Sequence, residues 1–147
     1  MNKIIIPPIF VLAAIAIESL CYFLAQDLNA IPFPYTMTGL ILLWAGFTLM
    51  GKTRELFKQH NTTLNIARSA SLVTEGVFSR TRNPMYIGMF LFLSGIAVCF
   101  GNLASMTVPF AFLLVIRNVF IPKEEKLLLE AFGGQYLEYK SRVRRWV

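Results

Sequence analysis

Two polar groups of residues carry the side chains of this sequence that could do chemistry. The first is the stretch LVTEGVFSRTRNPMYIG, residues 72–88, in which Asn83 followed by Pro84 is typical of a helix start. The second is the pair Glu124 and Glu125, which follows the last apolar run. Backbone N–H groups at a helix start bind anions, and carboxylates accept hydrogen bonds from ammonium groups and hydroxyls. We therefore expect the two groups to meet and form one ligand site.

The composition places these groups beside a membrane. Of the 147 residues, 56% are hydrophobic and only 15% are charged, which is too apolar for an ordinary soluble domain. The net charge of +6 could suggest nucleic acid, but the basic residues lie where membrane topology would place them. We expect membrane lipids with anionic headgroups as partners, and no nucleic acid.

The sequence offers few metal ligands. Cys21 and Cys99 both fall inside apolar runs and read as small buried hydrophobic residues, and His60 is the only histidine. Because structural zinc and haem sites need clustered cysteine or histidine ligands, we expect no metal.

The apolar runs predict an all-α integral membrane protein with about four transmembrane helices, a cytosolic loop and a C-terminal amphipathic helix at the interface. Basic residues concentrate in 51–83 and 122–147, so both segments and both termini are expected in the cytosol. We expect one domain over residues 1–147, and the predicted spans are residues 4–25, 35–50, 84–100 and 103–121.

The first apolar run has two features of its own. A basic start at Lys3 and the small residues around Ala14 also resemble a cleavable signal peptide, but the run continues well past that point, so a true span is expected. Glu18 lies near its middle, where a carboxylate is costly. Either it has a function, or it is protonated or bonded to Ser19 or to another helix.

The polar segments predict further structure. The first third of 51–82 could extend the second helix, and 62–73 suits short extended strands or an ordered loop. Gly76 permits a turn. Gly88 and Gly95 lie on one face of the third span, where a helix or ligand can approach closely.

Two features concern the last part of the chain. Pro109 should kink the fourth span. From Pro122 we expect a surface helix, broken near Gly133 and Gly134, whose apolar positions recur every three or four residues at Leu128, Phe132, Tyr136, Tyr139, Val143 and Trp146.

Together, residues 72–88, an apolar hairpin and EEKLLLEAFGGQYLEYKSRV resemble the isoprenylcysteine carboxyl methyltransferase and phospholipid methyltransferase superfamily over roughly residues 64–143. The resemblance implies S-adenosylmethionine-dependent methyl transfer without a dinucleotide-binding fold, and the sequence has no G-x-G-x-x-G after a strand. It implies that the cofactor is bound by Ser71, Leu72, Val73, Phe78, Asn83, Pro84, Met85, Tyr86 and Glu124.

Each of these residues also has an ordinary structural role open to it. Asn83 could simply cap the helix, Glu124 could be a solvated residue in a first turn, and the aromatic residues could belong to an interfacial belt. Arg117 could extend from the end of the span to the interface, or it could bind the substrate carboxylate. Prenylcysteine enzymes typically have histidine in place of Asn83 and arginine in place of Phe120, so Arg117 is the remaining candidate for that catalytic role beside Glu124.

Methyl transfer is an in-line displacement in which positioning dominates. A carboxylate acceptor needs no general base, whereas an amine acceptor must lose a proton, with Glu124, Glu125 or Glu18 as candidate bases. We expect a lipophilic acceptor that enters from the bilayer, most like an isoprenylcysteine carboxylate. The alternatives are a phospholipid or other hydrophobic amine or thiol, an NADPH-dependent membrane sterol or enone reductase, and a non-catalytic membrane protein that stabilises a partner.

Overall fold

The computed structural model describes residues 7–60 and 71–146, and within these ranges the regular elements are helices. Expectations for the residues before Pro7, and for most of the segment 62–73, lie outside the described residues. The elements are α1 (Pro7–Leu24), η1 (Gln26–Leu28), η2 (Tyr35–Thr38), α2 (Gly39–Gln59), η4 (Gly76–Ser79), α3 (Pro84–Phe100), α4 (Leu103–Val115), η5 (Ile116–Phe120) and α5 (Ile121–Arg142).

Several predicted bounds are confirmed. Helix α3 occupies the whole of the third predicted span, and α2 continues past Met50 to Gln59, as the extension of the second helix required. The second span differs at its start, because residues 35–38 form the 3-10 turn η2 before α2 begins. Gly76 has a φ of 59°, so it makes the expected turn.

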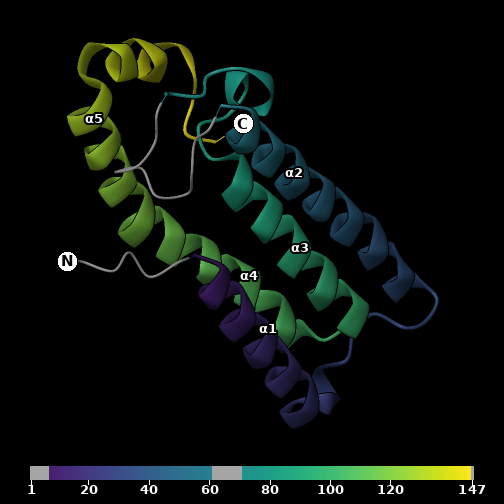
Figure 1. Ribbon diagram of the computed structural model, residues 1–147. Helices are drawn as coiled ribbons and strands as arrows, with labels where there is room; N and C mark the ends of the chain where they lie inside the picture. Colours follow the sequence, from purple (N-terminus) through teal and green to yellow (C-terminus); the bar gives the residue numbers. More distant parts are fainter. Residues whose placement is uncertain (1–6, 61–70, 147) are drawn as a thin grey trace.

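Helices α2 and α3 form the most extensive packed pair, and α1 packs on α4 and α3 (Figure 1). Four glycines bring α2 and α3 together. A Cβ atom on Gly95 would lie 2.6 Å from the backbone nitrogen of Leu43, and one on Gly46 would lie 2.6 Å from the carbonyl oxygen of Gly88. The predicted close approach at Gly88 and Gly95 is therefore made by a helix, whose own Gly39 and Gly46 share the same seven-residue spacing.

One helical rod runs through α4, η5 and the part of α5 that precedes Gly133, with a π-helical turn at Ile116–Phe120. The expectation that a separate helix begins at Pro122 is wrong. Proline lacks an N–H and its ring crowds the preceding turn, and the wider π turn accommodates both effects without ending the helix. Glu124 is thereby carried on a direct continuation of the fourth apolar segment.

The rod ends its straight course at Gly133, whose φ of 51° and ψ of −121° are not helical. The predicted break at this position is confirmed. Beyond it the chain reverses and crosses the upper end of the molecule in Figure 1. There Tyr136, Tyr139 and Val143 pack with Val73 and Phe78 in a small core, which we call the head cluster.

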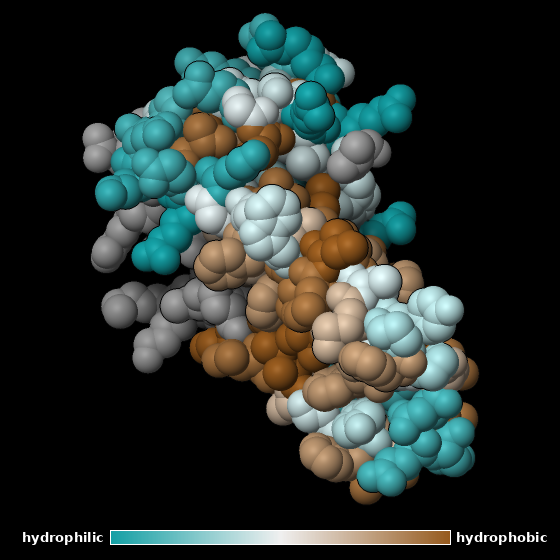
Figure 2. Space-filling model, turned by 90° about the vertical axis from the view of Figure 1, so that its right-hand side faces the viewer, coloured by the Kyte–Doolittle hydropathy of each residue, from teal (hydrophilic) through white to brown (hydrophobic). Residues whose placement is uncertain are grey.

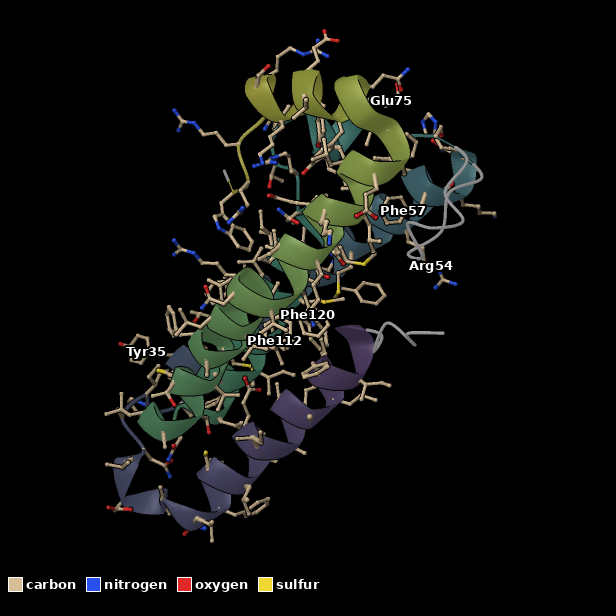
Figure 3. All side chains as sticks on the ribbon, turned by 90° about the vertical axis from the view of Figure 1, so that its left-hand side faces the viewer. Tyr35, Arg54, Phe57, Glu75, Phe112 and Phe120 are labelled. Carbon is tan, nitrogen blue, oxygen red and sulfur yellow. The ribbon has the colours of Figure 1, made fainter. Side chains whose placement is uncertain are left out.

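A second core, the central cluster, lies between the long helices. It contains Ala14 of α1, residues from α3, and residues from the α4–α5 rod: Tyr86, Met89, Leu93, Val108, Phe112, Ile116, Phe120 and Ile121. Figure 3 places Phe112 and Phe120 along that rod. The ring of Phe120 meets the ring of Phe10 edge-on at 5.0 Å between centroids, which helps to join α1 to the rod.

Glu18 on α1 is fully buried, and neither of its carboxyl oxygens has a hydrogen-bond partner among residues 7–60 and 71–146. Ser19 donates to the carbonyl oxygen of Ile15, and Ser105 donates to the backbone carbonyl oxygen of Glu18. The interpretation that Ser19 or another helix bonds the Glu18 carboxyl is therefore wrong, and the function of this side chain is untested.

Among the described residues, one helix, Leu103–Arg142, is long and apolar enough to cross a membrane by length and composition, while Ile9–Leu24 and Pro84–Phe100 are apolar but shorter. Large hydrophobic side chains such as Ile41, Trp44 and Phe47 are nevertheless exposed. Figure 2 shows hydrophobic residues in a band between two hydrophilic ends, and Figure 3 places Tyr35 and Glu75 toward opposite ends. The count of four spans stays a prediction.

Candidate functional site

The start of α3 lies against the end of the chain. Asn83 is the N-cap residue, yet its side chain accepts no hydrogen bond from the helix. Its Nδ2 instead donates to the carbonyl oxygen of Arg145 at 3.0 Å. The reading of Asn83 as an ordinary side-chain cap is therefore wrong. The Asn83 side chain therefore leaves the first N–H groups of α3 uncapped, which suits them to an anionic ligand.

One turn into α3, Tyr86 reaches across to the rod. Its hydroxyl donates to Oε1 of Glu124 at 2.5 Å, so the two polar groups of the sequence meet as expected. Burial raises the pKa of the Glu124 carboxyl, and the hydrogen bond from Tyr86 opposes that rise. Among the described residues, Tyr86 is the only side chain that bonds Glu124, which leaves its second oxygen for a ligand.

Glu125 has a different environment, because three cations surround it. Arg145 binds it through two guanidinium nitrogens at 3.0 Å each, Arg82 approaches its Oε1 at 3.2 Å, and Lys140 lies 3.6 Å from its Oε2. Burial acts to raise the pKa of Glu125, but the hydrogen bond from Arg145 and the charges of Arg82, Arg145 and Lys140 outweigh it and lower that pKa. The neighbouring carboxyl groups therefore differ: the pKa of Glu124 is raised, and that of Glu125 is lowered.

The remaining predicted cofactor residues fall into two places. Pro84 is buried at the start of α3, and Met85 packs on the central cluster with Tyr86. Val73 and Phe78 are buried in the head cluster, against which Leu72 packs. Tyr139 donates to the carbonyl oxygen of Phe78 at 2.8 Å, and the half-buried Ser71 begins the described part of the same stretch.

Arg117 is not brought to this site. Its side chain is exposed on the π-helical turn, and no hydrogen bond or ion pair among the described residues joins it to Asn83 or Glu124. The position of Arg117 on the rod is therefore the only structural support, among the described residues, for a substrate-binding role. Within the described residues, no three His, Cys, Asp or Glu side chains are grouped so that they could hold a metal ion.

Sequence reasoning did not identify the partners of Glu125. Arg82, Lys140 and Arg145 lie in the two segments, 51–83 and 122–147, in which basic residues concentrate. The contacts of Lys140 and Arg145 with Glu125 depend on the reversal at Gly133, which brings Glu125 and Arg145, 20 positions apart, into a bidentate pair. The excess of basic residues after the break was the available signal.

Residues 35–135, more than half of the chain, match the phospholipid methyltransferase family. The chain belongs to this family. The matched residues begin at η2 and end just after the break at Gly133 in α5. They therefore include both the start of α3 and the glutamate pair.

Curated relatives carry a more specific name. The chain is 37% identical over 75 residues to protein-S-isoprenylcysteine O-methyltransferase of Saccharomyces cerevisiae, which covers 49% of this chain and 30% of the relative. It is 41% identical over 75 residues to protein-S-isoprenylcysteine O-methyltransferase B of Arabidopsis thaliana, covering 49% and 36%. The match to the human protein-S-isoprenylcysteine O-methyltransferase is 36% over 76 residues, covering 50% and 26%. The chain therefore spans only 26–36% of the length of these relatives.

Proposed function

We propose that this protein transfers a methyl group from S-adenosylmethionine to a lipophilic acceptor at the cytosolic membrane interface, most like carboxyl methylation of an isoprenylcysteine-type substrate. One observation carries the proposal: the hydrogen bond from Tyr86 to Glu124. It joins the start of α3 to the glutamate pair, the two halves that the family resemblance assigns to the cofactor.

The residues present fit this cofactor. Its methionine part has a carboxylate, which suits the uncapped N–H groups at the start of α3, and an ammonium, which suits the oxygen of Glu124 that Tyr86 leaves unbonded. Tyr86 packs in the central cluster and is bonded through its hydroxyl, so it holds Glu124 beside the start of α3. When bound, the cofactor would supply a methyl group that is already bonded to a good leaving group, the sulfonium sulfur.

The geometry narrows the choice of base. Ser105, which bonds the backbone of Glu18, precedes Glu124 by 19 residues on the same rod, or about 28 Å at about 1.5 Å per residue. Glu18 is therefore far from the site, and Glu125 is held as an ion by three cations. These observations support Glu124 as the proposed base among the three expected candidates.

The membrane arrangement follows from the same layout. We propose that α1, α2, α3 and the rod up to Ile121 cross the bilayer and that both termini lie in the cytosol. The band of exposed apolar side chains in Figure 2 supports this, as does the polar end that holds the site. An acceptor in the bilayer would then approach the site sideways, past the rod that carries the exposed Arg117.

A second acceptor class has its own support. The family description is that of phospholipid methyltransferases, and burial raises the pKa of Glu124, which favours it as the base that an amine acceptor needs. A phospholipid amine is therefore the alternative to the prenylcysteine carboxylate.

Transfer of a labelled methyl group separates these possibilities. Purified protein in lipid nanodiscs is given labelled S-adenosylmethionine with either an N-acetylated S-prenylcysteine or phosphatidylethanolamine. We expect label in the prenylcysteine as a base-labile ester. Label in the phospholipid alone would establish the alternative. Oxidation of NADPH with a sterol or enone, without methyl transfer, would refute the proposal.

The exposed arginine is tested in the same assay. Arg117→Ala should weaken use of the acceptor more than binding of the donor, with the exposed Lys123→Ala as its control. An equal loss of both would remove Arg117 from the substrate site.

A further inference from the structure

Residues 143–146, which we call the closing segment, touch both halves of the candidate site. Val143 is buried in the head cluster, and Trp146 packs on the central cluster with Met85. Four consecutive residues thus link the two cores. Helix α2 also joins the two cores, since it carries Met50 against the central cluster and Phe57 against the head cluster.

The backbone of this segment binds the residues just before α3. The carbonyl oxygen of Arg145 accepts from the Thr81 hydroxyl at 3.1 Å and from Nδ2 of Asn83 at 3.0 Å, and the carbonyl oxygen of Arg144 accepts from the backbone N–H of Arg82 at 3.0 Å. Thr81 is itself buried, so these bonds are sheltered from water.

The side chain of Arg145 points to the other half. Its Nε and Nη2 each donate to a different oxygen of Glu125 at 3.0 Å, the two-pronged geometry in which arginine binds a carboxylate most strongly. Glu125 is 14% exposed, so this pair is only weakly screened. A single residue therefore binds the start of α3 with its carbonyl and the glutamate pair with its guanidinium.

We propose that Arg145 is a positioning residue that holds Asn83 and Glu124 at the separation which the adenosyl ligand requires. The inference rests on the proposed function. Arg145 does not touch Glu124 itself: it fixes Glu125, the next residue of the same helix, while its carbonyl fixes Asn83. Arg82 supports the same joint, since its Nη1 reaches both Glu125 and the Tyr136 hydroxyl.

The test measures equilibrium binding of S-adenosylhomocysteine, well below the unfolding temperature, to wild type, Arg145→Gln and Arg145→Lys. Arg142→Gln is the matched control, because Arg142 pairs with Glu138 in an exposed i,i+4 contact nearby. We expect Arg145→Gln to raise the Kd about tenfold or more, the loss typical of a hydrogen-bonded charge pair. Arg145→Lys should recover part of that loss, and Arg142→Gln should bind as wild type does.

A double-mutant cycle assigns the effect to the pair. In a Glu125→Gln background, Arg145→Gln should add little further loss of affinity, because its partner is already gone. A Kd for Arg145→Gln equal to that of Arg142→Gln would overturn the positioning role while leaving the proposed function intact. Wild-type protein that binds no adenosyl ligand would overturn both.

Discussion

Removing the hydroxyl of Tyr86 should weaken cofactor binding without disturbing the fold. The Tyr86→Phe change keeps the ring, which is 5% exposed and packs in the central cluster, and deletes only the donor to Glu124. A hydrogen bond to a charged group contributes about 1.5–3 kcal/mol. If this whole contribution acts on ligand binding, through the position and ionisation of Glu124, its loss raises the Kd of an adenosyl ligand about 10- to 100-fold.

Tyr86→Phe should also shift the pH dependence of ligand binding in a defined direction. Burial raises the pKa of Glu124, and the Tyr86 hydrogen bond holds that rise in check by favouring the ionised form. Without the bond the pKa rises further. Binding that needs the Glu124 carboxylate is lost as the pH falls through this pKa, so in Tyr86→Phe the loss should begin at a higher pH than in wild type.

The assay is calorimetric titration of S-adenosylhomocysteine into detergent-purified protein, from mildly acidic to mildly alkaline pH. Tyr22→Phe is the control, because Tyr22 stacks its ring on Phe100 at 5.0 Å, at the end of α3 far from the site. Tyr86→Phe with the affinity and pH profile of wild type would refute the assignment of Glu124. So would a variant that loses stability while its affinity stays the same.

Three further changes test the surrounding structure. In thermal denaturation, Gly95→Ala should destabilise the fold by about 1–3 kcal/mol, because its Cβ would lie 2.6 Å from a backbone nitrogen of α2. The control Gly51→Ala, which has open space around it, should be neutral or stabilising. Equal effects of the two changes would argue against close α2–α3 packing. Glu125→Gln should cost about 1.5–3 kcal/mol at neutral pH. Because the folded pKa of Glu125 is lowered, that difference should vanish as the pH falls below the unfolded pKa and through the folded one, and a pH-independent difference would contradict it. Glu18→Met should raise thermal stability, since it removes a buried carboxyl without partners, and should leave ligand affinity unchanged; a loss of affinity would show that Glu18 serves the site.

The sequence predicted the helices best where a local signal sets their ends. Pro84 fixes the start of α3, and Gly101, with a φ of 66°, fixes its end. The break at Gly133 was predicted on the same grounds. By contrast, Pro122 is also a local signal and was misleading, because a π turn before it absorbs the missing donor.

The sequence predicted which two groups of residues form the site, but it did not predict the side-chain contacts that connect them. The meeting of residues 83–86 with Glu124 followed from motif order, and Tyr86 makes that contact. Which glutamate is engaged by cations could not be predicted, since it depends on where Arg145 arrives after the chain reverses at Gly133. The side-chain partner of Asn83 was missed for the same reason, because local sequence indicated a helix cap and long-range packing supplied a carbonyl oxygen.

The central claim is that Glu124 binds the methyl donor, and one titration tests it most directly. S-adenosylhomocysteine is titrated into wild type, Glu124→Gln and Glu130→Gln, where Glu130 is an exposed glutamate on the same helix whose partner is Lys126. The account predicts that wild type and Glu130→Gln bind alike and that Glu124→Gln loses most of the affinity. Equal binding by all three proteins would contradict it.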